Sequence, residues 1–169
     1  MPTIVIDPGH YGNYNQGVCA GYYESVAMLK LSQYLGAALS AMGATVRYTR
    51  TTSAQNPSLQ ERGSLVPGAD LFISLHSDAS ANTAARGVTS YYSVRQPNSR
   101  PFAADIGRAA ASAMGNNFRG TIARPSETTP GYDYLGVLRA AVGAGVKNAF
   151  LIRDKPDYGR GYAFNRLDD

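Results

Sequence analysis

The chain has 169 residues, of which 44% are hydrophobic, which excludes a disordered chain and fits one globular domain with its own core. The formal net charge of +4 suits an anionic polymer, whether cell wall, membrane surface or nucleic acid, and no block of Lys or Arg forms a basic tail. The lone Cys19 excludes an internal disulfide, and no apolar run approaches the length of a membrane span, about 20 residues.

Apolar runs alternate with helix-period segments along the chain. We expect strands at 3–6, 45–48, 70–75, 87–93, 135–138 and 148–152, and helices at 23–42, 58–66 and 100–114. The polar pattern of 87–93 indicates an edge strand, and 116–134 is expected to be mostly loop. The alternation predicts one α/β domain over residues 1–169, with a twisted, mainly parallel sheet flanked by helices on both faces.

The expected helices carry apolar side chains at helical spacing. In the second, we expect Leu59 and Leu65 to face the core. The stripe of the first consists of Met28, Leu31, Leu35, Ala38, Leu39 and Met42. Extended back by one turn, this stripe reaches Glu24, a carboxylate on the buried side of the helix near its N-terminus. Such a group must be paired, hydrogen-bonded or bound to a metal, or else be an ordinary acid stabilised by the helix dipole.

The chain has two histidines, and each follows a buried strand. His10 comes after an apolar run that stops at Pro8-Gly9, and His76 closes a second apolar run. If these strands are parallel neighbours, both imidazoles lie along the edge where open α/β sheets bind ligands. The alternative is a structural histidine at a strand end.

Together, His10, Glu24 and His76 make a candidate metal triad, because two imidazoles and one carboxylate are a catalytic zinc ligand set. Asp7 is a candidate to orient a ligand or the metal-bound water, or else a turn aspartate before Pro-Gly.

The sequence resembles the zinc-dependent N-acetylmuramoyl-L-alanine amidases of the amidase-3 type. The resemblance covers residues 3 to 153 and rests on an ordered set of motifs rather than on any single one. These are 4–10 (IVIDPGH), Glu24, 43–50 (GATVRYTR), 59–62 (LQER), 69–79 (ADLFISLHSDA), 87–88 (GV) and 135–139 (LGVLR).

The resemblance implies a twisted α/β sheet flanked by helices and hydrolysis of the amide between N-acetylmuramic acid and L-alanine in peptidoglycan. It makes His10, Glu24 and His76 the ligands of a zinc ion. Arg139 is a candidate to bind a carboxylate of the stem peptide, or else a surface charge.

The chain departs from the family pattern after its last expected strand. The family's catalytic glutamate is replaced by Arg153, which cannot act as a general base, and residues 154–169 lack the usual closing motifs. Two acids are candidate substitute bases. Asp154 points to the opposite side of an extended chain from Arg153, and Glu127 belongs to the long loop. A degenerate or incompletely represented amidase is the third alternative.

The leading hypothesis is a zinc amidase, an endolysin or autolysin, and the alternative is a catalytically impaired wall-binding module on the same scaffold. A zinc carboxypeptidase and a nucleic-acid-binding protein fit the pattern less well. We expect peptidoglycan as the partner, a monomer, no membrane span and no nucleic acid. We expect a secreted or wall-associated protein, or one that a phage delivers to the wall, and no signal peptide in this chain.

Overall fold

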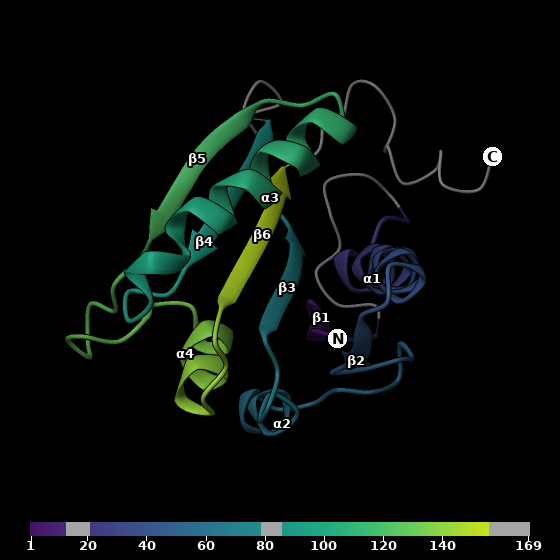
Figure 1. Ribbon diagram of the computed structural model, residues 1–169. Helices are drawn as coiled ribbons and strands as arrows, with labels where there is room; N and C mark the ends of the chain where they lie inside the picture. Colours follow the sequence, from purple (N-terminus) through teal and green to yellow (C-terminus); the bar gives the residue numbers. More distant parts are fainter. Residues whose placement is uncertain (13–20, 79–85, 156–169) are drawn as a thin grey trace.

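The computed structural model describes residues 1–12, 21–78 and 86–155 (Figure 1). The strands are β1 (Thr3–Pro8), β2 (Thr45–Tyr48), β3 (Leu71–Ser77), β4 (Gly87–Tyr92), β5 (Phe118–Ala123) and β6 (Ala149–Lys155). The helices are α1 (Glu24–Ala41), α2 (Leu59–Ser64), the 3-10 turn η1 (Pro97–Ser99), α3 (Arg100–Ala113) and α4 (Gly136–Gly143). None of the helices in these ranges is long and apolar enough to cross a membrane.

The strands form one six-stranded sheet in the order β2-β1-β3-β6-β4-β5. Neighbouring strands run parallel except β4 and β6, which pair antiparallel. The prediction of a mainly parallel α/β sheet is confirmed. Since β1, β3 and β6 are parallel neighbours, their carboxyl ends meet at one edge, which we call the carboxyl rim.

Helices cover both faces of the sheet, as predicted (Figure 1). On one face, Met28 of α1 and Ala103 of α3 pack in a cluster that includes Ile6, Ile73 and Phe150. On the other, the start of α4 and the segment after α2 pack against the opposite side of the same strands. That second cluster includes Val5, Val66, Phe72, Leu138 and Leu151. The side chains of β1, β3 and β6 therefore alternate between two cores, as expected of strands buried on both faces.

Residues 135–138 begin a helix rather than forming the predicted strand. The buried residues of α4 are Val137, Leu138 and Ala141, a spacing that belongs to one face of a helix. A run of four residues does not distinguish a strand from a buried helical turn. The residue that completes the helical spacing, Ala141, lies after the predicted strand.

The predicted edge strand is also wrong, because β4 lies between β6 and β5. The edge is β5, inside the segment expected to be loop. Small residues on α3 and β4 allow β4 to lie inside the sheet, covered by the helix. A Cβ on Gly107 of α3 would lie 2.9 Å from Ser90 Oγ, so the helix approaches this polar strand closely.

Four predicted core positions are exposed: Met42 is 83% exposed, Leu59 47% and Leu65 37%, and Ala38 is exposed as well. The buried line of α1 instead includes Ser25, Ser32 and Gly36 beside Met28. A Cβ on Gly36 would meet the Tyr48 side chain, so close helix–sheet packing selects small residues here over the larger apolar ones.

Candidate metal centre

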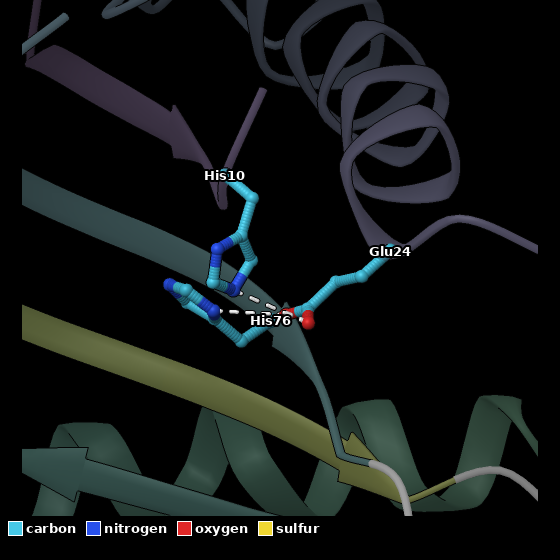
Figure 2. Close-up of side chains that lie close together, drawn as sticks. All are labelled: His10, Glu24 and His76. Atoms are coloured by element: carbon cyan, nitrogen blue, oxygen red, sulfur yellow. Dashed lines mark hydrogen bonds and ion pairs between the residues drawn. The ribbon is translucent and has the colours of Figure 1, made fainter. Parts of the chain in front are cut away.

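The side chains of His10, Glu24 and His76 meet at the carboxyl rim (Figure 2). His10 Nε2 lies 3.2 Å from Glu24 Oε2, and His76 Nδ1 lies 2.9 Å from Glu24 Oε1. One potential ligand atom from each residue lies within 4.8 Å of the other two. The two imidazole rings stand edge to face, with centroids 5.0 Å apart. The structure thus brings together the three residues that the sequence singled out.

The end of β1 positions His10 against β3. The Gly9 N–H donates to the Leu75 carbonyl at 2.9 Å, which continues the pairing of the two strands beyond Pro8. A Cβ on Gly9 would lie 2.7 Å from the His76 ring, so only glycine allows the two ligand-bearing segments to approach this closely. His10 follows with φ 57°, a left-handed conformation that turns the chain away from the strand direction.

Glu24 is the first residue of α1 and is buried. Its Oε1 accepts a hydrogen bond from the Ser77 N–H at 2.8 Å, which orients the carboxylate toward the rim. Burial alone would raise the pKa of Glu24. The hydrogen bonds and charges of His10 and His76 outweigh this and hold the pKa well below its usual value. The carboxylate is therefore ionised at neutral pH, as a metal ligand must be.

The three donor groups fit a divalent transition metal. Zinc bonds of about 2.1 Å in tetrahedral geometry place ligand atoms about 3.4 Å from one another. One donor atom from each residue lies within 4.8 Å of the other two, and the two carboxylate oxygens approach the imidazoles to 2.9 and 3.2 Å, so a small adjustment of these side chains would reach that spacing. Three protein donors leave a fourth position for a water or substrate, which is the arrangement of catalytic rather than structural sites.

Asp7 makes its hydrogen bonds with groups other than the candidate ligands. Its Oδ1 accepts hydrogen bonds from Thr49 Oγ1 and Arg62 Nη1, both at 2.6 Å, and its Oδ2 accepts one from Ser74 Oγ at 2.6 Å. Among the described residues, none of the three candidate ligands is a hydrogen-bond partner of this carboxylate. Asp7 therefore neutralises the buried Arg62 and joins β1 to β3 beneath the site.

Arg50 connects the segments that carry His10 and Glu24. Its side chain is fully buried, and it donates to the carbonyls of Pro8 at 3.1 Å, Gly9 at 2.9 Å and Ser25 at 2.6 Å. Burial and the charge of Arg62 lower the pKa of Arg50, while the charge of Asp7 opposes that shift. One guanidinium thus fixes the end of β1 relative to the start of α1.

A cavity of about 480 Å³ opens beside the two histidines, on the face covered by α2 and α4. Its wall includes both imidazoles, Arg62, Arg153 and the start of α4 at Gly136. Arg153 and His76 are paired residues of neighbouring strands, so their side chains leave the sheet on the same face. The candidate metal centre is therefore adjacent to a concave surface large enough for a small molecule or a peptide segment.

Arg153, which lines the cavity, contacts two neighbouring side chains. Its Nε lies 3.3 Å from Asp78 Oδ1, and its guanidinium carbon lies 5.5 Å from the centroid of the Tyr91 ring. The Nε is buried and makes no hydrogen bond within the described ranges. The contact with Asp78 is therefore an ion pair in which the N–H does not point at the carboxylate oxygen.

The other predicted site residues lie away from the triad. Asp154 projects to the α1/α3 face, where Asn116 Nδ2 donates to its Oδ1 at 3.1 Å. Glu127 is exposed in the segment after β5, and this segment is closed by a bridge between Pro125 and Asp133. Through β4, the end of β5 is aligned with the start of β6, whereas the histidines lie near the end of β6 at the carboxyl rim. Glu127, which follows β5, therefore lies at the other end of the sheet from the histidines.

Arg139 is exposed on α4, and its Nη1 donates to the Asp133 carbonyl at 2.8 Å. It is absent from the cavity wall that the described residues form. Residues 156–169, the part of the departing C-terminal stretch that follows β6, lie outside the described residues.

The sequence reasoning missed the residues that position the ligands. Arg50 and Arg62 belong to motifs that the resemblance had already singled out, and Ser77 and Asp78 directly follow His76. A signal was available, because an arginine inside an otherwise buried motif needs a buried partner. The sequence does not show that these partners are Asp7 and backbone carbonyls from other elements.

A buried carboxylate and two imidazoles at the carboxyl rim of an α/β sheet, beside an open cavity, are the donor set of a metal-dependent hydrolase. The sequence profile of the amidase-3 family, described as N-acetylmuramoyl-L-alanine amidase, matches residues 4–147. The chain belongs to this family of cell-wall amidases, which confirms the resemblance found in the sequence.

Two curated relatives are similar over part of their length. The N-acetylmuramoyl-L-alanine amidase LytC of Bacillus subtilis is 31% identical over 122 residues, which are 70% of this chain and 24% of LytC. The probable cell wall amidase LytH of Staphylococcus aureus is 38% identical over 94 residues, 53% of this chain and 31% of LytH. The chain matches only about a quarter to a third of the length of these relatives.

Solved structures share the fold. The catalytic domain of CwlV, an N-acetylmuramoyl-L-alanine amidase from Bacillus (Paenibacillus) polymyxa var. colistinus, superposes with a TM-score of 0.74 at 24% identity. This match covers 90% of this chain and 79% of that one. Cwp6 from Clostridium difficile gives a TM-score of 0.74 at 31% identity, covering 89% of this chain and 24% of Cwp6.

Proposed function

We propose that this domain hydrolyses the amide between N-acetylmuramic acid and L-alanine in peptidoglycan, with a zinc ion held by His10, Glu24 and His76. The observation that carries the proposal is the convergence of three donor groups within 4.8 Å of one another at the carboxyl rim. Membership of the amidase family supports peptidoglycan as the substrate, and the adjacent cavity could accommodate the stem peptide.

When bound, zinc supplies Lewis-acid activation of water and of the amide carbonyl. The chain's own contribution is to hold the donors in place. Glu24 brings one negative charge, and the Ser77 N–H fixes the direction of its carboxylate. Arg50 keeps the backbone segments of His10 and Glu24 together, and such preorganisation is needed because small misplacements of reacting groups cost rate.

The cavity, as far as the described residues line it, lacks a carboxylate that is free to act as a general base. Among the described residues of its wall, the only carboxylate is Asp7, and hydrogen bonds already occupy both of its oxygens. Loss of a general base usually costs about 10²–10⁴ in rate. We therefore expect turnover below that of an amidase with a glutamate at position 153.

A second candidate function follows from the same position. Arg153 faces the cavity where a base is expected, which favours a wall-binding module that retains the scaffold and turns over poorly. In either case we propose a monomer that acts outside the cell or at the wall, as an endolysin or an autolysin.

The test is incubation of the zinc-loaded protein with purified cell walls. An amidase releases free amino groups without new reducing ends, and a chelator abolishes the release. Arg153→Glu is expected to raise the rate, because it introduces a carboxylate beside the metal centre. Arg108→Glu is the matched control, since this arginine is exposed on α3 and pairs with Asp105. No release from walls by either the parent protein or Arg153→Glu would refute the amidase proposal, and sedimentation with intact walls would then favour the binding module.

A further inference from the structure

We propose that Arg153 makes the cavity beside the histidines a binding site for an anionic group, the free carboxylate of a stem peptide. This inference deepens the proposed function and takes the identity of the substrate from it. It goes further by assigning the arginine a positive role in choosing among peptides, rather than treating it only as a lost base.

The position of Arg153 suits contact with the residue that follows the scissile amide. It lies opposite His76 in the register of β3 and β6, and neighbouring strands are about 4.8 Å apart. One extended residue spans about 3.3–3.6 Å. A peptide with its first amide at the histidines therefore brings the carboxylate of its second residue within reach of this guanidinium.

The guanidinium has hydrogen-bonding capacity to offer. Asp78 approaches the Nε of this side chain at 3.3 Å, and this nitrogen makes no hydrogen bond to any described residue. The side chain is 24% exposed and lines the cavity. Contact with the Tyr91 ring limits the rotation of the Arg153 side chain, so the guanidinium is positioned before a ligand binds.

The charges of the cavity wall favour an anion. Its other arginine, Arg62, is neutralised by Asp7 at 2.6 Å and also donates to the carbonyls of Pro57 and Pro8. Arg153 is also paired, with Asp78 at 3.3 Å, but its Nε makes no hydrogen bond in that contact, so it is the less fully engaged arginine of this wall. A planar guanidinium matches the two oxygens of a carboxylate, whereas a carboxamide offers one acceptor and no charge.

The experiment uses two dipeptides that begin with L-alanine and are products of the proposed reaction, so they are not consumed. They differ in whether the second residue carries free carboxylates or carboxamides. Each is titrated by calorimetry into the zinc-loaded protein. We expect the acid to bind about tenfold more tightly than the amide, as one charge-assisted hydrogen bond would provide.

Three variants separate charge from shape. Arg153→Gln should bind both dipeptides equally, Arg153→Lys should keep part of the preference, and the control Arg108→Gln should keep all of it. Equal binding of the two dipeptides by the parent protein, no measurable binding of either, or an unchanged preference in Arg153→Gln would each overturn the inference. A preference for the acid, together with no release from walls by either the parent protein or Arg153→Glu, would uphold this inference while refuting the proposed hydrolysis.

Discussion

Asp154 is a buried carboxyl group that the candidate site does not use. Burial raises the pKa of this group to about 6, against the lowering effect of hydrogen bonds from Asn116 and from the backbone of Lys155. The negative charge of Asp78 adds to the increase. At the scale of a single residue, the folded state therefore favours the protonated acid, which the unfolded chain loses at a pKa of about 3.9.

The consequence is a fall in stability with rising pH. Between pH of about 4 and about 6 the unfolded chain releases the proton of Asp154 while the folded chain keeps it, so the free energy of unfolding decreases through this window. Asp154→Asn removes the titration. It should be more stable than the parent protein by on the order of 2–3 kcal/mol at pH 7 and equal to it below pH of about 4.

Urea unfolding at a series of pH values measures this difference. Asp105→Asn is the matched control, because Asp105 is exposed on α3. A difference between parent and Asp154→Asn that does not change with pH would contradict the assignment.

At the scale of elements, the site depends on how β1, β2 and α1 are joined. Arg50, just after β2, donates to carbonyls at the end of β1 and in the first turn of α1. These carbonyls lie next to the candidate ligands in the chain. Removal of the guanidinium leaves them buried without partners, which is costly in the folded state.

We expect Arg50→Met to lower the free energy of unfolding by about 3 kcal/mol, because methionine fills much of the space but donates no hydrogen bond. Chemical denaturation measures the loss. Arg108→Met, which removes an exposed arginine from α3, should change stability by less than about 0.5 kcal/mol. Similar small effects of both substitutions would show that Arg50 does not hold these elements together.

At the scale of the whole molecule, a metal held by the proposed ligands from β1, α1 and β3 would couple binding to folding. The donors come from positions 10, 24 and 76 and converge only in the folded chain. A ligand that binds only the folded state stabilises it by about 2.7 kcal/mol at 100 times its dissociation constant. Zinc should therefore raise the thermal unfolding midpoint of the parent protein, and a chelator should reverse the increase.

His76→Ala should lose most of this zinc-dependent shift. Glu127→Ala should keep it, since Glu127 is exposed in the segment between β5 and α4. Differential scanning calorimetry with and without zinc measures both. A parent protein whose midpoint does not respond to zinc, or a His76→Ala variant that responds equally, would contradict a shared metal site.

The sequence predicted the parts of the molecule that depend on local patterns. The alternation of strands and helices predicted the mainly parallel sheet, and two histidines after buried strands, with an acid on the inner side of a helix, pointed to the triad. The predictions from local sequence patterns were wrong where packing between distant segments decides the structure. β5 pairs with β4 although its residues are only half-buried, and α4 begins with an apolar run too short to show its period.

The supporting arginines were unpredictable for a related reason. Arg62 pairs with Asp7, 55 positions away, and Arg50 binds carbonyl groups, which every residue possesses. No spacing rule identifies such partners. Asp7 was predicted either to orient a ligand or the metal-bound water or to be a turn aspartate, and spacing did not show that its partners come from β3, α2 and the residue after β2.

The left-handed backbone of His10 places a steric demand on the position that is independent of its imidazole. Asparagine, aspartate and glycine accept this conformation readily, whereas β-branched residues resist it. Replacement by asparagine would therefore remove the ring with little change in chain direction, and replacement by valine would disturb the loop as well. The contrast between these two side chains separates the contribution of the nitrogen donor from that of the turn which presents it.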